Sequence, residues 1–287
     1  MKCKTGEASL TFIFDPAPEY ARGSVSWQIE NDKLVAAFGQ GTLILHLPNQ
    51  SVVLHKTKSG FDIKLEIKSG ETKELILEYQ PIDLVENILP KKLEQVTVDF
   101  WRDWVNKGNF VTFCRDKLIR SAITLKLMQF APTGAIIAAP TTSLPETVGG
   151  IRNWDYRYVW IRDATFTLYA LHTLGYYEEA ERFFDFIHSI VEKCADRQFD
   201  ISLMYTIFGE AVPAEESLDG LSGYMKSKPV RLGNGAARQF QLDVYGSLID
   251  AVYFATKRGL TSEHKGRMRK LVMNLVDKIE QTWQDSD

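Results

Sequence analysis

The stretch GGIRNWDYRYVWIRDATFTLYALHTLGYYEEAERFFDFI, residues 149–187, carries most of the information on the fold. Apolar residues recur at helical spacing in one stripe before Gly175 and in a second that runs just past the end of the stretch. The first is Ile161, Ala164, Leu168 and Leu171, and the second Ala180, Phe183, Phe184, Ile187, Ile190 and Val191. Glycine is a common helix stop because it adopts a left-handed backbone without steric cost. The stretch therefore predicts two helices joined by a short loop at 175–178.

Three further amphipathic helices are predicted on either side of this pair. Their apolar stripes are Leu118, Ala122, Leu125 and Met128; Val244, Leu248, Val252 and Ala255; and Met268, Leu271, Val272, Leu275, Val276 and Ile279. The connection at 259–263 is short, whereas those at 131–157 and 198–238 are long and rich in Gly, Pro, Thr and aromatic residues. Long loops in a compact domain are usually functional. Helical hairpins with long loops at one end predict an α-toroid with its site at that end.

The first 80 residues follow a different pattern. Short runs of alternating apolar and polar residues recur about every ten residues, which is typical of an antiparallel sandwich. The clearest run places Phe61, Ile63, Leu65 and Ile67 on one face of a strand, with charged residues on the other. The alternation stops after Pro81, and a short helical linker punctuated by Pro90 and Gly108 follows. We therefore expect a β-sandwich domain at 1–82, a helical linker at 83–108 and a toroid domain at 109–287.

Composition narrows the classes of function. The chain has 287 residues, with 34 basic and 37 acidic residues interspersed for a net charge of −3, so it offers no basic stripe for nucleic acid and no polybasic membrane patch. Neither a signal peptide nor a membrane-spanning run is evident, and we expect a cytoplasmic protein. Cys3, Cys114 and Cys194 lie far apart and are expected to be buried free thiols. The five histidines do not cluster, so neither a metal nor another cofactor is expected.

Aromatic and charged residues are concentrated just before the first helix of the quoted stretch. Trp154, Tyr156, Tyr158 and Trp160 alternate, so their rings can share one face of an extended segment, and Arg162 and Asp163 follow at the predicted helix start. Aromatic faces cover the apolar surface of a sugar ring, and planar charged groups bind pairs of hydroxyls. The alternative is structural: the rings fill the core, and an aspartate in a first helical turn stabilises the helix. The residue types leave both interpretations open.

A second polar set lies at 215–241. Glu215, Glu216 and Asp219 are candidates for general acids or for ordinary loop carboxylates. The residues suited to hydroxyl recognition or to helix capping are Arg231, Asn234, Arg238, Gln239 and Gln241. No Gly-x-Ser-x-Gly nucleophile motif is present, which leaves carboxylate chemistry.

Four segments together resemble glycoside hydrolase family 15, especially its prokaryotic glucoamylase and trehalase members: PTGAIIAAPTTSLPE (132–146), GGIRNWDYRYVWIRDATFTLYAL (149–171), LGYYEEAERFFDFI (174–187) and KPVRLGNGAARQFQLDVYGSLIDA (228–251). The likeness runs from about Phe12 to the end of the chain. It implies an N-terminal β-sandwich, a linker and about half of an (α/α)6 toroid. It also implies a carbohydrate-metabolising enzyme that hydrolyses terminal α-glucosidic bonds with inversion.

The resemblance also implies roles for individual residues. Arg162 and Asp163 would hydrogen-bond the hydroxyls of the terminal glucose, and Tyr156 and Trp160 would pack near its ring. Tyr224 would form a further aromatic wall, and Arg231 and Asn234 a polar rim. The substrate-binding set assigned in this way is Tyr156, Tyr158, Trp160, Arg162, Asp163, Tyr224, Arg231 and Asn234.

Catalysis in this family uses one glutamate as acid and a second as base, with a water between them. The acid lies in a Trp-Glu motif shortly after a helix like LVMNLVDKIEQTWQDSD, residues 271–287, and neither glutamate is found here, so no catalytic residue is assigned. We expect a fragment, a split gene product or a decayed member with little or no activity alone. The alternative is a non-catalytic carbohydrate-binding or subunit-like protein that completes its toroid with a second polypeptide. The sequence does not separate starch-type substrates from trehalose.

Overall fold

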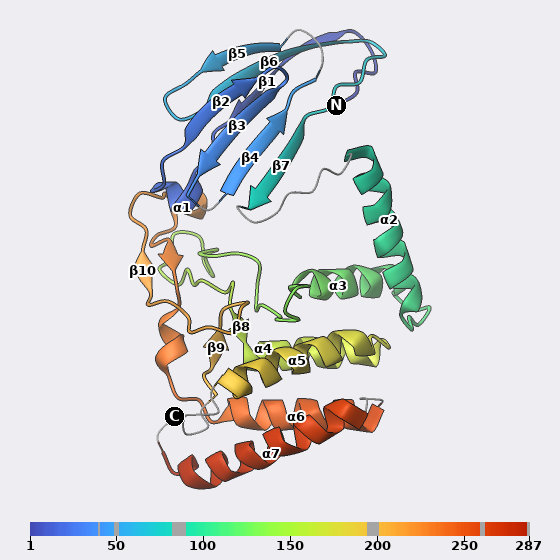
Figure 1. Ribbon diagram of the computed structural model, residues 1–287, viewed down its shortest axis with the longest axis vertical. Helices are drawn as coiled ribbons and strands as arrows, with labels where there is room; N and C mark the ends of the chain where they lie inside the picture. Colours follow the sequence, from blue (N-terminus) through green and yellow to red (C-terminus); the bar gives the residue numbers. More distant parts are fainter. Residues whose placement is uncertain (40, 49–51, 82–89, 194–200, 259–261, 286–287) are drawn as a thin grey trace. The chain divides into compact units, whose positions relative to one another are not determined.

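The computed structural model describes residues 1–39, 41–48, 52–81, 90–193, 201–258 and 262–285, and it divides the chain into two compact units. The first unit spans Met1–Val98 and the second Asp99–Asp287 (Figure 1). The first unit consists mainly of strands and the second mainly of helices. Each unit has its own hydrophobic core.

The first unit is built from two antiparallel sheets (Figure 1). One sheet has the strand order β1-β6-β5 and the other β2-β3-β4-β7. The strands are β1 (Glu7–Phe14), β2 (Ser26–Glu30), β3 (Lys33–Phe38), β4 (Gly41–His46), β5 (Val52–Lys56), β6 (Phe61–Lys68) and β7 (Ile76–Pro81), with one short helix, α1 (Pro18–Ala21), after β1. All the strands expected from the alternating pattern form.

A shared core joins the two sheets. On β6, Phe61, Ile63 and Leu65 are at most 3% exposed, and they pack in one cluster with Leu34 and Leu45 of the other sheet. Trp27 on β2 meets the ring of Phe61 edge-on at a centroid distance of 5.0 Å. The period-2 pattern buries one face of β6 and leaves the other in contact with water, as the sequence predicts.

The second unit contains the predicted helices. They are α3 (Arg115–Leu127), α4 (Ile161–Thr173), α5 (Tyr177–Lys193), α6 (Asp243–Arg258) and α7 (Ser262–Thr282). Before them, α2 (Pro90–Lys107) is an 18-residue helix rather than the short linker expected, and residues 82–89 of that linker lie outside the described residues. Pro90 is the first residue of α2, where a proline costs nothing because its missing N–H has no intrahelical partner.

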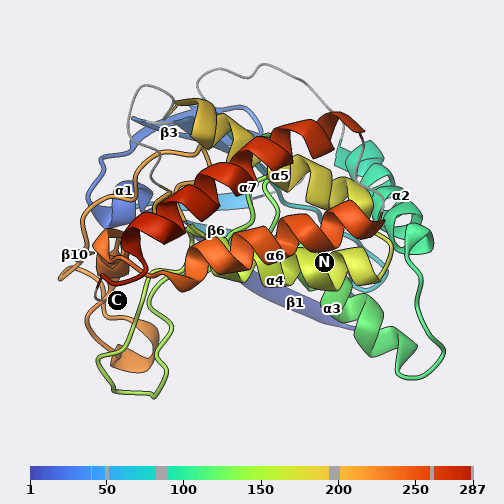
Figure 2. The ribbon, with the colours of Figure 1, turned by 90° about the horizontal axis from the view of Figure 1, so that it is seen from below.

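The helices pack as two neighbouring hairpins, α4 with α5 and α6 with α7 (Figure 2). Helix α4 also packs along α6, and α5 along α7. Gly175 ends the first hairpin's leading helix with a φ of +91°, and the N–H of Tyr176 donates to the Leu171 carbonyl at 3.1 Å. The core between the hairpins includes Phe183, Phe184 and Leu248, none of which is exposed.

The prediction of buried thiols is wrong for Cys114, which is exposed. Cys114 lies immediately before α3 with a left-handed φ of 54°, so its side chain is not part of the face that α3 buries. Cys3 is half-buried, and Cys194 lies outside the described residues.

Candidate functional site

Two long loops meet beside the first turns of α4 and α6. One short strand pair joins the two loops, β8 (Val159–Trp160) with β9 (Met204–Tyr205). A second lies within the later loop, β10 (Glu216–Ser217) with β11 (Arg231–Leu232). Thr142 and Asp155 form a further antiparallel bridge. The loops expected to carry the site therefore converge, and both lead directly into helices of the core (Figure 1).

The aromatic run is extended and half-buried. Backbone hydrogen bonds from Ala138 to Tyr158 and from Ala139 to Tyr156, each 2.9 Å, hold it against the preceding loop. The alternate residues Asn153, Asp155 and Val159 are at most 1% exposed, whereas all four rings keep intermediate exposure. The rings of Tyr156 and Trp160 lie 6.4 Å apart. This burial pattern points the rings away from the best-buried side of the segment, although Tyr158 and Trp160 also contact the core.

Arg162 and Asp163 lie in the first turn of α4. The N-cap of α4 is Trp160, which makes no side-chain capping hydrogen bond, and Asp163 is the third residue of the helix. The Arg162 guanidinium donates from Nη1 to Asp243 Oδ2 at 2.8 Å, while its Nε lies 4.0 Å from Asp163 Oδ2. It also lies 5.3 Å from the centre of the Trp160 ring. Of the two residues predicted from sequence, Arg162 therefore binds Asp243, the first residue of α6.

The electrostatics of Asp163 differ from those of a surface carboxylate. Burial raises its pKa, and the Arg162 charge and its own backbone N–H offset only part of that rise. Burial also raises the pKa of the Tyr156 hydroxyl, as do the negative charges of Glu146 and Asp163. In the described part of the chain, the indole Nε1 of Trp160 is buried without a hydrogen-bond partner. A desolvated acceptor and an unsatisfied donor thus belong to residues three positions apart at the start of α4, and such groups are common at functional sites.

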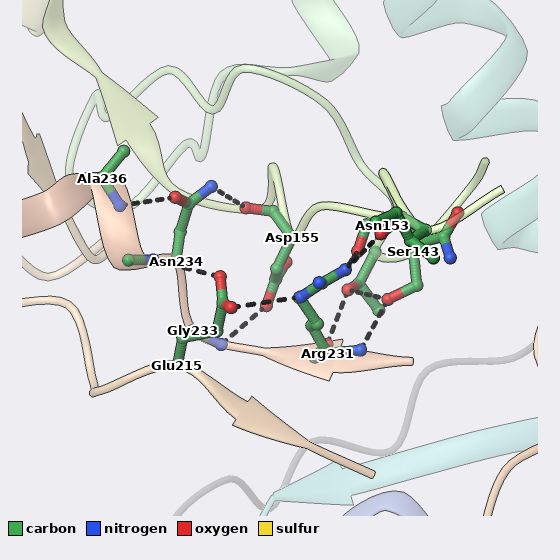
Figure 3. Close-up of polar contacts among 11 residues, drawn as sticks. Ser143, Asn153, Asp155, Glu215, Arg231, Gly233, Asn234 and Ala236 are labelled. Atoms are coloured by element: carbon green, nitrogen blue, oxygen red, sulfur yellow. Dashed lines mark hydrogen bonds and ion pairs between the residues drawn. The ribbon is translucent and has the colours of Figure 1, made fainter. Parts of the chain in front are cut away.

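Arg231 and Asn234 lie beside the aromatic run and use their polar groups within the protein (Figure 3). Arg231 donates to the carbonyl oxygens of Ile151 and Asn153 at 3.0 Å each, and its Nε donates to Glu215 at 3.1 Å. The guanidinium also lies 4.5 Å from the centre of the Trp154 ring. This makes Arg231 a brace between the two long loops.

Asn234 completes this brace through Asp155. Its Nδ2 donates to the Asp155 carbonyl at 3.1 Å, and its Oδ1 accepts from the Ala236 N–H at 3.0 Å. The buried Asp155 carboxylate receives two bonds of 2.8 Å from the Arg157 guanidinium and one of 3.2 Å from the Gly233 N–H. Together these contacts hold the backbone at Asp155, next to Tyr156 and in the segment that carries Trp160.

The remaining candidates are Tyr224 and three carboxylates, of which Glu215 belongs to the brace made by Arg231. Tyr224 is 56% exposed in a short 3₁₀ turn, Tyr224–Lys226. In the described part of the chain, no ring contact or hydrogen bond links it to Trp160 or Asp163. Glu216 and Asp219 are exposed, and Glu215 accepts from Arg231 and from the Gly235 N–H. Sequence reasoning missed Asp243, because an acid in a first helical turn is adequately explained by the helix dipole.

Two classes of site are not seen in the described residues. No group of three or more His, Cys, Asp and Glu side chains there is arranged to hold a metal ion. Among the helices of those same ranges, none is both long enough and apolar enough to cross a lipid bilayer.

Comparison with known proteins defines the class. Residues 113–287 match the family model described as glycosyl hydrolases family 15. A trehalase of Mycolicibacterium smegmatis is 35% identical over 298 aligned positions, which cover 100% of this chain and 44% of that protein. A trehalase of Thermoplasma acidophilum is 38% identical over 193 positions, covering 67% of this chain and 32% of the relative. No solved structure matches.

The chain therefore belongs to glycosyl hydrolase family 15. A further relative, named trehalase 2, from Sulfolobus acidocaldarius, is 40% identical over 164 positions and is covered over 28% of its length. The chain spans less than half the length of these curated relatives.

Proposed function

We propose that this chain recognises the terminal glucose of an α-glucoside, with trehalose as the substrate, within a glycoside hydrolase of the trehalase type. The observation that carries the proposal is the Asp163 carboxylate, which is partly desolvated and lies beside Arg162 and the half-buried ring of Trp160. The names of the relatives favour trehalose over starch-type substrates.

In this proposal each side chain has a distinct task. Asp163 accepts hydrogen bonds from sugar hydroxyls, and Arg162 donates to neighbouring oxygens from the N–H groups that do not bind Asp243. Trp160 and Tyr156 cover the apolar surface of the ring, and Tyr158 supports them from the core. Arg231 and Asn234 act on the sugar indirectly, by holding the loop that carries the rings.

The same proposal assigns bond cleavage to other residues. Inversion needs an acid and a base on opposite sides of the sugar, with room for a water between them. Near the rings, Asp155 is paired with Arg157, and Glu215 with Arg231. We propose that neither of these is the acid or the base, and that both catalytic carboxylates belong to the part of the relatives' length that this chain does not span. We also propose that the helical hairpins are part of an (α/α)6 toroid.

We expect the purified 287-residue chain to bind glucose and trehalose without hydrolysing trehalose. Loss of an acid and a base removes proton transfers that contribute about 10²–10⁴-fold each to the rate. Calorimetric titration measures the binding, with galactose as the control sugar, and glucose release from trehalose, maltose and starch measures the turnover. Absence of glucose binding contradicts the proposed recognition of glucose. Robust glucose release contradicts the proposal that the catalytic acid and base are not in this chain.

A second candidate function rests on the groove between α4 and α6. The groove has a volume of about 570 Å³ and is lined by Thr165, Phe166, Tyr169, Ala170, Gly246, Ser247, Asp250 and Ala251. Phe166 and Tyr169, both on α4, are 67% and 43% exposed, so the groove presents aromatic surface to solvent. The occupant that fits is a second polypeptide supplying further helices, which makes this chain a subunit.

This candidate predicts self-association of the isolated chain through the open groove. Sedimentation velocity at increasing concentration should show species heavier than a monomer, because exposed aromatic surface is buried when copies associate. The Phe166→Gln variant should shift the distribution toward the monomer, whereas Phe12→Gln, at a 37% exposed position in the other unit, should not. A wild-type chain that stays monomeric contradicts the subunit interpretation.

A further inference from the structure

The contacts of Arg162 are strongly asymmetric. Its Nη1 is 2.8 Å from Asp243 Oδ2, a hydrogen-bonded ion pair, although Asp243 is 81 residues away in the sequence. Its Nε is 4.0 Å from Asp163 Oδ2, which is outside hydrogen-bond distance, although Asp163 is the adjacent residue. The guanidinium therefore lies toward α6 rather than over its neighbour on α4.

This asymmetry determines whether Asp163 is open to a ligand. A guanidinium has five N–H donors in a planar fork and pairs readily with both oxygens of a carboxylate. If it turned toward Asp163, a bidentate pair would occupy both carboxylate oxygens and two of the N–H donors, which leaves fewer of these groups for sugar hydroxyls. The contact with Asp243, together with stacking over the Trp160 ring at 5.3 Å, holds the guanidinium in the other position.

We propose that Asp243 is a positioning residue that holds Arg162 away from Asp163, so that both side chains stay available to the bound glucose. The proposal rests on the proposed function of the site. Asp243 acts through Arg162 and needs no contact with the sugar. The side chains of Arg162 and Asp243 are 35% and 46% exposed, so the pair lies at the rim, where a ligand can reach the guanidinium.

A purely structural role for Asp243 makes a different prediction. Asp243 is the first residue of α6, and a carboxylate there stabilises the helix dipole whatever residue stands at position 162. In that case removing the Asp243 carboxylate changes the affinity for glucose by the same factor whether or not Arg162 is present. The two roles are therefore separated by a double-mutant cycle.

The cycle compares wild type, Asp243→Asn, Arg162→Gln and the double variant of the 287-residue chain by calorimetric titration with glucose. We expect Asp243→Asn to weaken binding about tenfold, as for the loss of one hydrogen bond to a charged group. In the Arg162→Gln background the same change should have no further effect. Asp243→Glu should restore most of the affinity, and Asp277→Asn, at an exposed position on α7, should leave it unchanged. Equal losses in both backgrounds overturn the proposal.

A ligand-free measurement separates failure of this proposal from failure of the proposed function. The ionisable groups that act on Asp163 are Arg162, 4.0 Å away, and Tyr156, whose pKa the Asp163 charge helps to raise. Glu146 acts on Tyr156, and Asp243 contacts Arg162. Titration of the Asp163 carboxyl by ¹³C NMR should show that Asp243→Asn lowers its pKa more when Arg162 is present than in the Arg162→Gln background, because the freed guanidinium moves closer. Equal shifts overturn the positioning role, even if wild type binds glucose. A chain that binds no glucose but shows unequal shifts contradicts the glucose-binding function alone.

Discussion

Replacing Asp163 by alanine is expected to weaken glucose binding about 10- to 100-fold, the range for losing a hydrogen bond to a charged group. The carboxylate is the acceptor that the proposed subsite contributes, and its nearest cation, Arg162, stays 4.0 Å away. Calorimetric titration of the variant against wild type measures the loss. Asp277→Ala, at an exposed position on α7, is the control and should bind glucose as wild type does.

The same carboxylate should cost stability in the absence of sugar. Because burial raises the pKa of Asp163 in the folded state, its contribution to stability is largest below the ordinary aspartate pKa and is lost as the pH rises through the raised value. The isosteric Asp163→Asn variant has no carboxylate to ionise and does not lose this stability. The melting temperature of the variant minus that of wild type should therefore be larger at pH 7 than at pH 3. If the Asp163→Asn variant melts well below wild type at pH 7, the ionised Asp163 stabilises the fold, and its role is in packing or in stabilising the helix.

The second large effect concerns a buried ion pair between α3 and α5. Glu179, whose side chain is 4% exposed, lies 3.0 Å from the Lys126 ammonium and accepts from the Trp104 indole at 2.7 Å. Its backbone carbonyl accepts from Gln129 at 2.9 Å. We expect Glu179→Ala to lower the free energy of unfolding by about 3–5 kcal/mol, because the largely buried ammonium loses its counter-charge, keeping Gln129 Oε1 as an acceptor, and the buried indole N–H loses its acceptor.

Urea denaturation followed by circular dichroism measures this loss. The matched control is Glu178→Ala on the same helix, since Glu178 is 62% exposed and pairs with Arg182 across one turn at 3.3 Å. A surface pair of this kind contributes about 0.3–0.5 kcal/mol. Similar losses for the two variants would show that the Glu179 network does not stabilise the second unit.

Local periodicity predicted the strands β1–β7 and the helices α3–α7. The alternation at Phe61, Ile63 and Leu65 follows directly from one buried face of a strand, and the stripe ending before Gly175 follows from one buried face of a helix. The length of α2 was missed because Pro90 was taken as punctuation, although proline is also favoured at a helix start. The predicted boundary of a helix is wrong where the residue type at that boundary, here proline, can either end a helix or begin one.

The candidate site was predictable only in part. Arg162 and Asp163 follow from residue type and from the family likeness, since the two are adjacent and lie beside a row of rings. Their partner Asp243 and the brace from Arg231 to Ile151 and Asn153 join residues about 80 positions apart. No periodic pattern encodes such contacts, because they depend on how two long loops fold over the same helix ends.

The brace made by Arg231 has a consequence for how this site can evolve. Its guanidinium binds the main-chain oxygens of Ile151 and Asn153, which are present whatever side chains those positions carry. Ile151 is 74% exposed, so its side chain can be exchanged while the hydrogen bond beneath it persists. One arginine therefore preserves the path of the backbone, while the exposed side chain at position 151 can change without breaking that hydrogen bond.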